Sequence, residues 1–419
     1  MERNVQELVK YWEDVPGKMS IASEKDQYIK ENLAILLNNQ KQKDIKAETI
    51  FESNTITNTA AQTNTGGDGS FSPISLALVR RTFPELFANK VVGVQAMAGP
   101  VGLAYALRFF YDTTALPQVE AAFNAVEDYS GFTGKTPAIS GAADSGRGAA
   151  TATGEGFTFG NADVAKKMPE LSLKIDQTAV TAATRKLAAS FSLEAAQDIK
   201  AMHGVDVERE MVNVLQYEIQ AEMDREIVGR LHGLAENVAK GGKTKDTLDL
   251  SATAAAGTIS SDGRWSQERF SSVVTQIIKQ ANDIAISTRR GAGNFAIVST
   301  RLATALQAAG PVFSRNQANV NPTGTMTDIG TINGNITIYH DTYHATTTDS
   351  ALVGYKGSGI SDAGLIYSPY LMGLMNRAID PEDFSPRVGV MSRYAMTDNL
   401  LGAGRYYRKL EVTNLDNII

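Results

Sequence analysis

The stretch VRRTFPELFANKVVGVQAMAGPVGLAYALRFFY, residues 79–111, raises the question of what the whole chain is for. A basic pair and a proline precede a β-like apolar run at 91–97, and a Gly-Pro turn at 99–100 leads into a second run that ends in Phe-Phe-Tyr. Apolar runs bounded by turn residues are typical of strands. No catalytic side chain stands out here. The stretch therefore predicts extended strands and arginines that serve contact and not chemistry.

The composition of the chain limits its class. It has 419 residues, 43% of them hydrophobic and 21% charged, which predicts two or three compact units or one large discontinuous unit. A net charge of −6 disfavours a non-specific nucleic-acid binder, and the absence of cysteine excludes disulfides, thiolate metal sites and a cysteine nucleophile. No apolar run reaches the ~18 residues of a membrane span, and the N-terminus lacks the apolar core of a signal peptide. We therefore expect a protein that is made and used without export.

The first 70 residues divide into two segments of different character. Residues 1–52 include Ile29, Leu33, Leu36 and Leu37 at helical spacing amid charge, which predicts an amphipathic helix. Residues 53–70 contain no Lys or Arg and are rich in Thr, Asn and Gly, a composition typical of a flexible arm. Residues 131–166, rich in Gly, Ala, Ser and Thr, are interpreted as a long loop or small insertion.

The strongest local pattern predicts one long helix over 206–239. Asp206 is a favourable N-cap, and Gly241-Gly242 ends the pattern. Apolar residues recur at three- and four-residue steps: Met211, Val214, Leu215, Ile219, Met223, Ile227, Leu231, Leu234 and Val238. Such a helix is about 50 Å long at 1.5 Å per residue. It requires an apolar partner along its length, because helix propensity alone does not hold a helix in water.

The remaining elements are mixed in type. Leu171, Leu173 and Ile175 alternate as in a strand, a second helix is predicted at Ser266–Arg289, and a strand at Asn294–Thr300. A short alanine-rich helix and several short strands follow. Strands on both sides of the long helix favour an α+β fold with a discontinuous domain.

Motifs that could carry chemistry are weak. Gly242-Lys243-Thr244 resembles the end of a phosphate-binding loop, but Asn237 stands where that loop needs glycine. Gly154–Gly160 has the wrong glycine spacing for a dinucleotide fingerprint. His340 and His344 lie near a strand end, where an exposed pair is favoured over a metal site, and His203 is favoured as a cation at a helix C-terminus.

Carboxylates on the long helix are interpreted in the same way. Glu222 and Glu226 favour a solvated or interface face over an acid/base pair, and Arg230 is placed to pair with Glu226 four residues away. No catalytic residue, cofactor site or metal site is predicted, and the chain is not expected to be an enzyme.

Three ordered blocks resemble the major head proteins of T-even-type tailed bacteriophages. The first block lies in the opening stretch and comprises Val79-Arg80-Arg81, Pro84, Leu86, Gly93-Val94-Gln95, Met97, Pro100, Gly102, Ala106-Leu107-Arg108 and Tyr111. The second is RKLAASFSLEAAQDIKAMHGVDVEREMVNVLQYEIQAEMDREIV, residues 185–228. The third begins at RRGAGNFAIVS and continues through VGYKG, AGLIYSPY and DPEDFSPRVGVMSRYA. Residues 112–170 depart from the family, being too short for its inserted domain.

The resemblance implies the HK97-like capsid fold. The expected division is a 1–52 assembly segment, an N-arm at 53–90, an E-loop with a reduced insertion at 91–185, a P-domain with the spine helix at 186–240, an A-domain at 241–375, and P-domain return strands at 376–419. The expected function is a major capsid protein that self-assembles into hexamers to form the icosahedral head around the viral double-stranded DNA. Whether the same chain also forms pentamers is left open.

The resemblance also implies partners and site residues. The expected partners are other copies of the chain, vertex, portal and scaffold proteins, a prohead protease, and packaged DNA held non-specifically. No membrane partner is expected. Assembly is expected in the host cytoplasm, and the finished protein in the capsid of the virion. Cleavage is expected between Glu52 and Ser53, chosen over similar motifs at Glu31 and Glu236 because it falls at the composition break. Arg80, Arg81 and Arg108 are expected at contacts between subunits, with pairing inside their own chain as the alternative.

Three other functions stay open at this level. One is the vertex protein of the same phage class, which forms pentamers. Another is an encapsulin-type compartment shell, although its members are not expected to carry these sequence blocks or a removable front segment. The third is an enzyme of unknown type, although the sequence offers no convincing site for one.

Overall fold

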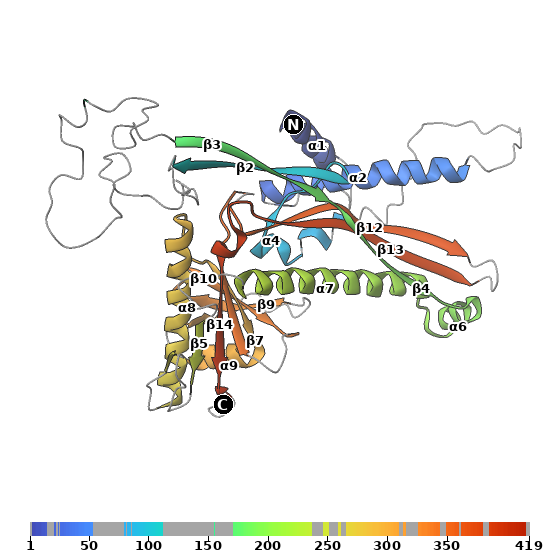
Figure 1. The fold of residues 1–419 in the computed structure, drawn as a ribbon. Coiled ribbons are helices and arrows are strands. Elements are labelled where there is room, and N and C mark those ends of the chain that lie inside the picture. Colours follow the sequence, from blue (N-terminus) through green and yellow to red (C-terminus); the bar gives the residue numbers. More distant parts are fainter. Residues whose placement is uncertain are drawn as a thin grey trace, which may run out of the picture.

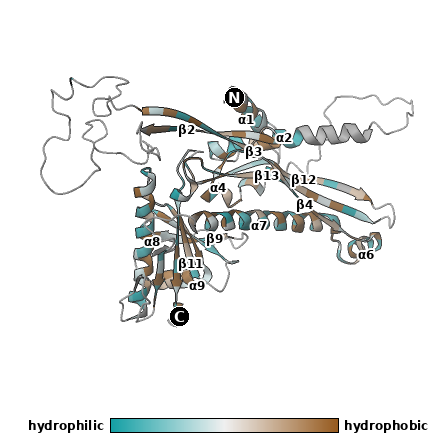
Figure 2. Cartoon of the chain, in the orientation of Figure 1, coloured by the Kyte–Doolittle hydropathy of each residue, from teal (hydrophilic) through white to brown (hydrophobic). Residues whose placement is uncertain are grey.

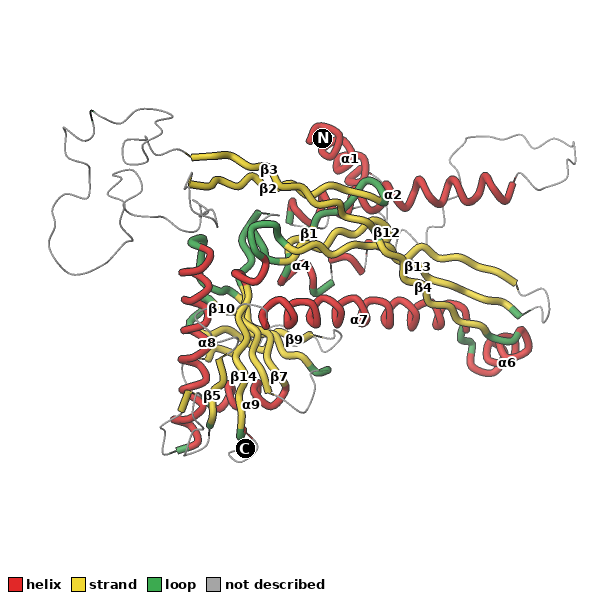
Figure 3. Tube along the Cα trace, viewed as in Figure 1, coloured by secondary structure: helices red, strands yellow, loops and turns green. Residues whose placement is uncertain are grey.

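The computed structural model describes most of the chain. The described residues are 2–14, 21, 24, 26–52, 79–80, 82–84, 86–111, 155, 171–236, 246–250, 259–260, 265–309, 313–315, 326–343, 349–359, 362–379 and 385–415. Their strands form a four-stranded sheet, an eight-stranded sheet and a two-stranded ribbon, with helices between and around them (Figure 1, Figure 3). The predicted α+β class is confirmed. The predicted arm at 53–70 and the motif at 242–244 lie outside the described residues, as does nearly all of the predicted loop at 131–166.

The four-stranded sheet lies between two helices. Its strands are, in order, β1 (Gly93–Val94), β12 (Leu365–Ile379), β13 (Pro386–Asp398) and β4 (Ala183–Ser190). β1 runs parallel to β12, and the other pairs are antiparallel. α2 (Gln27–Glu52) packs along β12 on one side, and α7 (Val207–Glu236) packs against β13 and β4 on the other (Figure 1). The sheet thus joins segments from the start, middle and end of the sequence.

α7 is a single helix of 30 residues, about 45 Å long. Asp206 caps it, because its Oδ1 accepts a hydrogen bond from Glu208 N at 3.2 Å. Its inward stripe is buried in the main core and comprises Leu215, Ile219, Met223, Ile227 and Leu231. The predicted long helix is confirmed, with its last described residue at Glu236 instead of 239.

The eight-stranded sheet packs between α7 and two further helices. Its order is β6 (Ile259–Ser260), β5 (Asp246–Asp249), β14 (Tyr407–Thr413), β11 (Asp349–Gly354), β7 (Phe295–Ser299), β10 (Ile336–Asp341), β9 (Met326–Ile332) and β8 (Phe313–Arg315). α8 (Ser266–Thr288) and α9 (Thr300–Ala308) pack against this sheet and against each other. The short helix η3 (Ala403–Tyr406) leads into β14.

β7 shows how the sheet separates two cores. Phe295 and Ile297 belong to the main core with α7, whereas Ala296 and Val298 belong to a second core with α8 and α9. Alternate residues of a strand face opposite sides of a sheet. A strand that is buried on both faces therefore carries mostly apolar residues at consecutive positions. This explains the uninterrupted apolar run that predicted the strand.

The ribbon consists of β2 (Val101–Tyr111) and β3 (Leu171–Thr181), paired antiparallel along their whole length. β3 continues past Ala182 into β4, so the ribbon grows directly out of the four-stranded sheet and projects beyond it (Figure 1). Of the two apolar runs predicted in the opening stretch, the second is β2. The first contributes only β1, after the short helix α4 (Ala88–Val91), and pairs with β12.

The N-terminal helices pack on the body of the molecule. α1 (Glu2–Asp14) packs against α2, and the main core includes Trp12, Leu33, Leu36 and Leu37. The predicted amphipathic helix is therefore confirmed, with its apolar side buried against its own chain. The division of the chain into domains stays a prediction.

The packing of α7 makes a prediction about stability. Ile227 is fully buried, whereas Val214 on the same helix is 55% exposed. We expect Ile227→Ala to lower the free energy of unfolding by about 2–5 kcal/mol, because it leaves a cavity, and Val214→Ala to change it by less than about 0.5 kcal/mol. Urea unfolding of the unassembled chain, followed by circular dichroism, measures both. Equal shifts for the two variants would contradict this packing.

Candidate functional site

One face of the ribbon is apolar and open to solvent. The register of β2 and β3 places alternate residues of both strands on the same face. The large exposed side chains on this face are Val101, Leu103, Tyr105, Leu107, Phe109, Leu171, Leu173 and Ile175. Their exposed fractions run from 45% at Phe109 to 63% at Ile175. Figure 2 shows hydrophobic and hydrophilic residues alternating along the ribbon. A continuous apolar patch of this kind marks a surface that another molecule covers. We call it the apolar ribbon face.

On the opposite face of the ribbon, charged side chains of β2 and β3 pair with one another. Arg108 Nη1 lies 3.1 Å from Asp176 Oδ2, and Lys174 Nζ lies 3.1 Å from Asp176 Oδ1. Hydrogen bonds from Lys174 and Arg108 lower the pKa of the Asp176 carboxyl below its ordinary value. The Arg108 guanidinium also lies over the Phe110 ring, 5.0 Å from its centroid. The two faces of the ribbon therefore differ sharply in chemistry.

Among the described residues, the root of the ribbon packs against the body of the molecule. Val180, on the polar face near the end of β3, is buried in a small cluster with Met97, Tyr370, Leu371 and Ala395. These residues come from the segment after β1 and from β12 and β13. The root therefore fixes the direction of the ribbon while most of its length stays exposed.

Ion pairs brace the groove beside this root. A groove of about 710 Å³ is lined by residues 178–181 of β3, by residues 394–400 and by two charged residues of α7, Glu226 and Arg230. Arg185 on β4 pairs with Glu222 and Glu226, the Tyr394 hydroxyl donates to Glu226, and Arg230 Nη2 lies 2.6 Å from Asp398 Oδ2.

This arrangement corrects a prediction. The expected pairing of Glu226 with Arg230 along the helix is wrong, because each charge is drawn to an opposite charge on the neighbouring sheet. Burial, together with the hydrogen bond to Glu226, raises the pKa of Tyr394. The cross-links join α7 to β4 and β13, so they stiffen the base from which the ribbon projects.

The predicted site residues lie on different elements. Glu52 is the last residue of α2, and Ser53 lies outside the described residues. Arg80 is half-buried, and Arg81 lies outside the described residues. Arg108 pairs with Asp176 of its own chain, which is the alternative that the sequence left open. The structure thus places these residues without showing a contact between subunits.

The predicted histidines lie on separate elements. His203 ends α6 (Leu193–His203), as predicted, before Gly204 at φ 69°. His340 Nε2 lies 3.0 Å from Thr300 Oγ1, and burial lowers the pKa of His340; His344 lies outside the described residues. Within the described part of the chain, no three His, Asp or Glu side chains are grouped to hold a metal. No helix in that part is long and apolar enough to cross a membrane.

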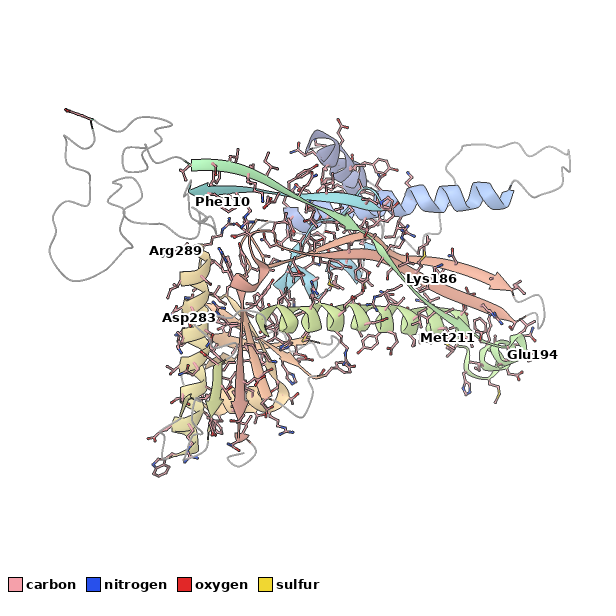
Figure 4. The ribbon with its side chains drawn as sticks, in the orientation of Figure 1. Phe110, Lys186, Glu194, Met211, Asp283 and Arg289 are labelled. Carbon is pink, nitrogen blue, oxygen red and sulfur yellow. The ribbon has the colours of Figure 1, made fainter. Side chains whose placement is uncertain are left out.

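A second exposed region lies at the other end of the molecule. α6 has no buried residue, and Leu193 and Met202 are both exposed. Figure 4 shows Glu194 of α6 and Met211 of α7 at this end, far from Phe110 on the ribbon.

The alternation at Leu171–Ile175 predicted the strand but not its exposure. The matching alternation of β2, read together with it, would have indicated a ribbon with one largely apolar face.

The sequence of this chain is similar to those of phage major capsid proteins. The family described as "Major capsid protein Gp23" matches residues 69–417. The major capsid protein of Vibrio phage KVP40 is 29% identical over 407 residues, covering 82% of this chain and 79% of the relative. That of Salmonella phage ViI is 30% identical over 352 residues, covering 79% of this chain and 78% of the relative. The mature capsid of bacteriophage PhiM1 aligns over 86% of this chain and 93% of its own, with a TM-score of 0.44 and 10% identity.

The two faces of β3 give a second prediction. We expect Ile175→Ala, on the apolar ribbon face, to change the stability of the unassembled chain by less than about 0.5 kcal/mol, because the side chain is already in water. Val180→Ala, on the buried side, should cost about 1.5–3 kcal/mol. Urea midpoints at low protein concentration measure both. A large loss for Ile175→Ala would mean that its face is covered within the single chain.

Proposed function

The chain belongs to the Gp23 major capsid protein family, and from that premise we propose how its surfaces serve assembly. It is a structural protein with the HK97-like capsid fold, whose copies associate to form the icosahedral head of a T4-like phage. Its place is in the capsid of the virion.

The apolar ribbon face is the surface on which a neighbouring subunit packs. Burying a side chain such as Leu107 or Ile175 stabilises a contact by about 1.5–3 kcal/mol before the costs of association are subtracted. Because each subunit gives one ribbon and receives another, modest contacts add up over a closed shell. The ribbon lies within the 91–185 range expected for the E-loop.

Most of the other expected ranges contain described elements. α7 lies in the proposed P-domain range 186–240, and β7 and its neighbours lie in the proposed A-domain range 241–375. β12 spans the proposed boundary at 375, and β14, from the 376–419 range, pairs with β5 and β11. The C-terminal range therefore contributes strands to both sheets. The N-arm range 53–90 lies largely outside the described residues.

The proposed partners derive from the role in a closed head. Other copies form hexamers and neighbouring capsomers, and vertex, portal and scaffold proteins and a prohead protease complete the assembly in the host cytoplasm. The packaged DNA is held only non-specifically, and the net charge of −6 disfavours strong attraction to its phosphates. Arg80 and Arg81 are proposed to contact acidic groups of neighbours. Arg108 does so by sharing or exchanging its partner Asp176.

Removal of residues 1–52 is proposed as a maturation step. The family match begins at residue 69, beyond the proposed cut, and Glu52 stands at the end of α2. Glu31 lies inside the same helix, which continues to Glu52, so backbone hydrogen bonds hinder cleavage there; Ala235, beside Glu236, is buried in the main core. These facts favour Glu52 over the other matching motifs.

The role of the ribbon is tested by two matched variants. We expect the double variant Leu107→Ser, Ile175→Ser to lower the yield of closed, processed particles about tenfold or more, because the contact loses its apolar surface. Lys174→Ser, on the opposite face of the same ribbon, should assemble nearly as the natural chain does. Sedimentation and electron microscopy count the particles. Normal particles from the double variant would refute the proposed role of this face.

Intact-mass measurement of protein from mature heads tests the cleavage. We expect a product beginning at Ser53, which Glu52→Gln abolishes and the matched variant Glu31→Gln leaves unchanged. The uncut 45.0 kDa chain in mature heads would remove the cleavage step from the proposal.

A further inference from the structure

The segment 93–97 has one edge paired with a strand and one edge filled by side chains. β1 is the first strand of its sheet, so only one of its edges lies against β12. On that edge, Gln95 N and Met97 N donate to Tyr367 O and Pro369 O, each at 2.9 Å. The groups of Val94 and Ala96 point the other way, as alternation along a strand requires. An outer edge of this kind is open to another strand unless something covers it.

Two side chains of α2 cover this edge. Val94 N donates to the Tyr28 hydroxyl at 2.7 Å, and that hydroxyl donates in turn to Val94 O. Ala96 N donates to Asn32 Oδ1 at 2.9 Å, and Asn32 Nδ2 donates to Val94 O at 3.3 Å. The two side chains thus supply the donors and acceptors that a neighbouring strand would supply. Asn32 is buried, so these bonds are shielded from water.

The same helix also covers the apolar surface beside the edge. Asn39 Nδ2 donates to Met97 O at 2.7 Å and to Tyr370 O at 3.2 Å. Tyr370 lies at a register shift in the pairing of β12 with β13, between Pro369 and Leu371. Tyr28, Asn32 and Asn39 are spaced by four and seven residues, so they form one stripe on the helix. The adjoining stripe, Leu33, Leu36 and Leu37, is buried in the main core with Val79, Phe83 and Val94.

We propose that the outer edge of residues 93–97 is a strand-pairing site that α2 occupies, and that the β2–β3 ribbon of a second copy pairs with it once residues 1–52 are gone. The proposal rests on the removal of that segment and on the contact role of the ribbon. It adds the place on the neighbour where the ribbon docks. It also assigns Tyr28, Asn32 and Asn39 as the residues that keep this place closed.

The ribbon has both properties that the vacated site requires. Loss of α2 leaves the outward backbone groups of Val94 and Ala96 with water as their only partner and uncovers apolar surface beside them. β2 and β3 pair only with each other in the described structure, so each has an outer edge that pairs with no strand, and the ribbon carries an apolar face as well. Edge-to-edge pairing would satisfy the polar groups while the apolar ribbon face helps to cover the exposed core.

The ribbon must come from another copy because of chain connectivity. β2 begins at Val101, only a few residues after Met97, and runs away from the sheet for 11 residues, about 36 Å. Val180 holds the root of the ribbon against Met97 itself. A ribbon fixed in this way cannot turn back onto the outer edge of 93–97 in its own chain. The contact is therefore heterologous, with different surfaces on the two partners.

Hydrogen exchange at the edge tests the proposal. A full chain carrying a specific protease site between Glu52 and Ser53 is folded intact, and exchange is then measured by residue-resolved mass spectrometry at Val94 and Ala96. Gln95 and Met97, which donate to β12, serve as internal references. We expect slow exchange at Val94 and Ala96 in the intact chain. After cutting in dilute, unassembled subunits we expect exchange roughly tenfold or more faster, and renewed protection in cut, closed particles.

The outcomes distinguish this proposal from the proposed function. If the double variant Leu107→Ser, Ile175→Ser blocks assembly but natural cut particles leave Val94 and Ala96 unprotected, the ribbon docks elsewhere and only the present inference fails. If the double variant assembles normally, the contact role of the ribbon fails as well. Protection that returns in dilute cut subunits would mean that the chain's own residues refill the edge, and this too overturns the proposal.

A reversible cross-link gives a second measurement. The chain has no cysteine, so Asn32→Cys with Ala96→Cys introduces a single disulfide that holds α2 on the edge after cutting. We expect cutting to raise the dissociation temperature of particles only when this disulfide is reduced. The reduced double variant is the matched control. An equal rise in oxidised and reduced particles would show that release of α2 from the edge is not needed.

Discussion

The apolar stripe of α7 holds the two sheets of this molecule together. Leu215, Ile219 and Ile227 share one core with residues of β12 and β13 on one side and of β7 and β11 on the other. A helix about 45 Å long keeps its conformation in water only with a partner along its length, and each sheet needs a cover for the face turned toward the helix. The helix and the two sheets thus bury one another's apolar surfaces. The ribbon, α2 and the groove are all positioned by this shared core.

Local patterns in the sequence were sufficient for elements whose burial is set by one repeating face. The three- and four-residue spacing predicted α7, and the run Asn294–Thr300 predicted the strand that the structure shows as β7, Phe295–Ser299. Alternation at Leu171–Ile175 predicted β3 for the same reason. Periodicity reports which side of an element is buried, but it carries no information about which distant element does the burying.

Long-range choices explain what the sequence did not disclose. Glu226 pairs with Arg185 of β4 and not with Arg230 one turn away on α7. At the groove the sheet offers each of these two α7 residues an opposite charge, Arg185 for Glu226 and Asp398 for Arg230. Asn32 and Tyr28 look like ordinary polar helix residues, yet they bond backbone groups more than sixty residues away. The partner of the first apolar run was likewise hidden, since β12 lies far along the chain. For the contact face, the two strands of the ribbon had to be read together.

The contrast between the well-packed centre of the molecule and the exposed ribbon bears on how one subunit can fit different positions in a curved lattice. Ion pairs from Arg185 and Arg230 join α7 to the neighbouring sheet, beside the main core that helix and sheet share. Among the described elements, the ribbon beyond its root and α6 have the least packing to resist bending. Differences in local curvature between flat facets and sharper corners would be absorbed at these two extremities. A single amino-acid sequence can then serve positions of unequal geometry without repacking its interior.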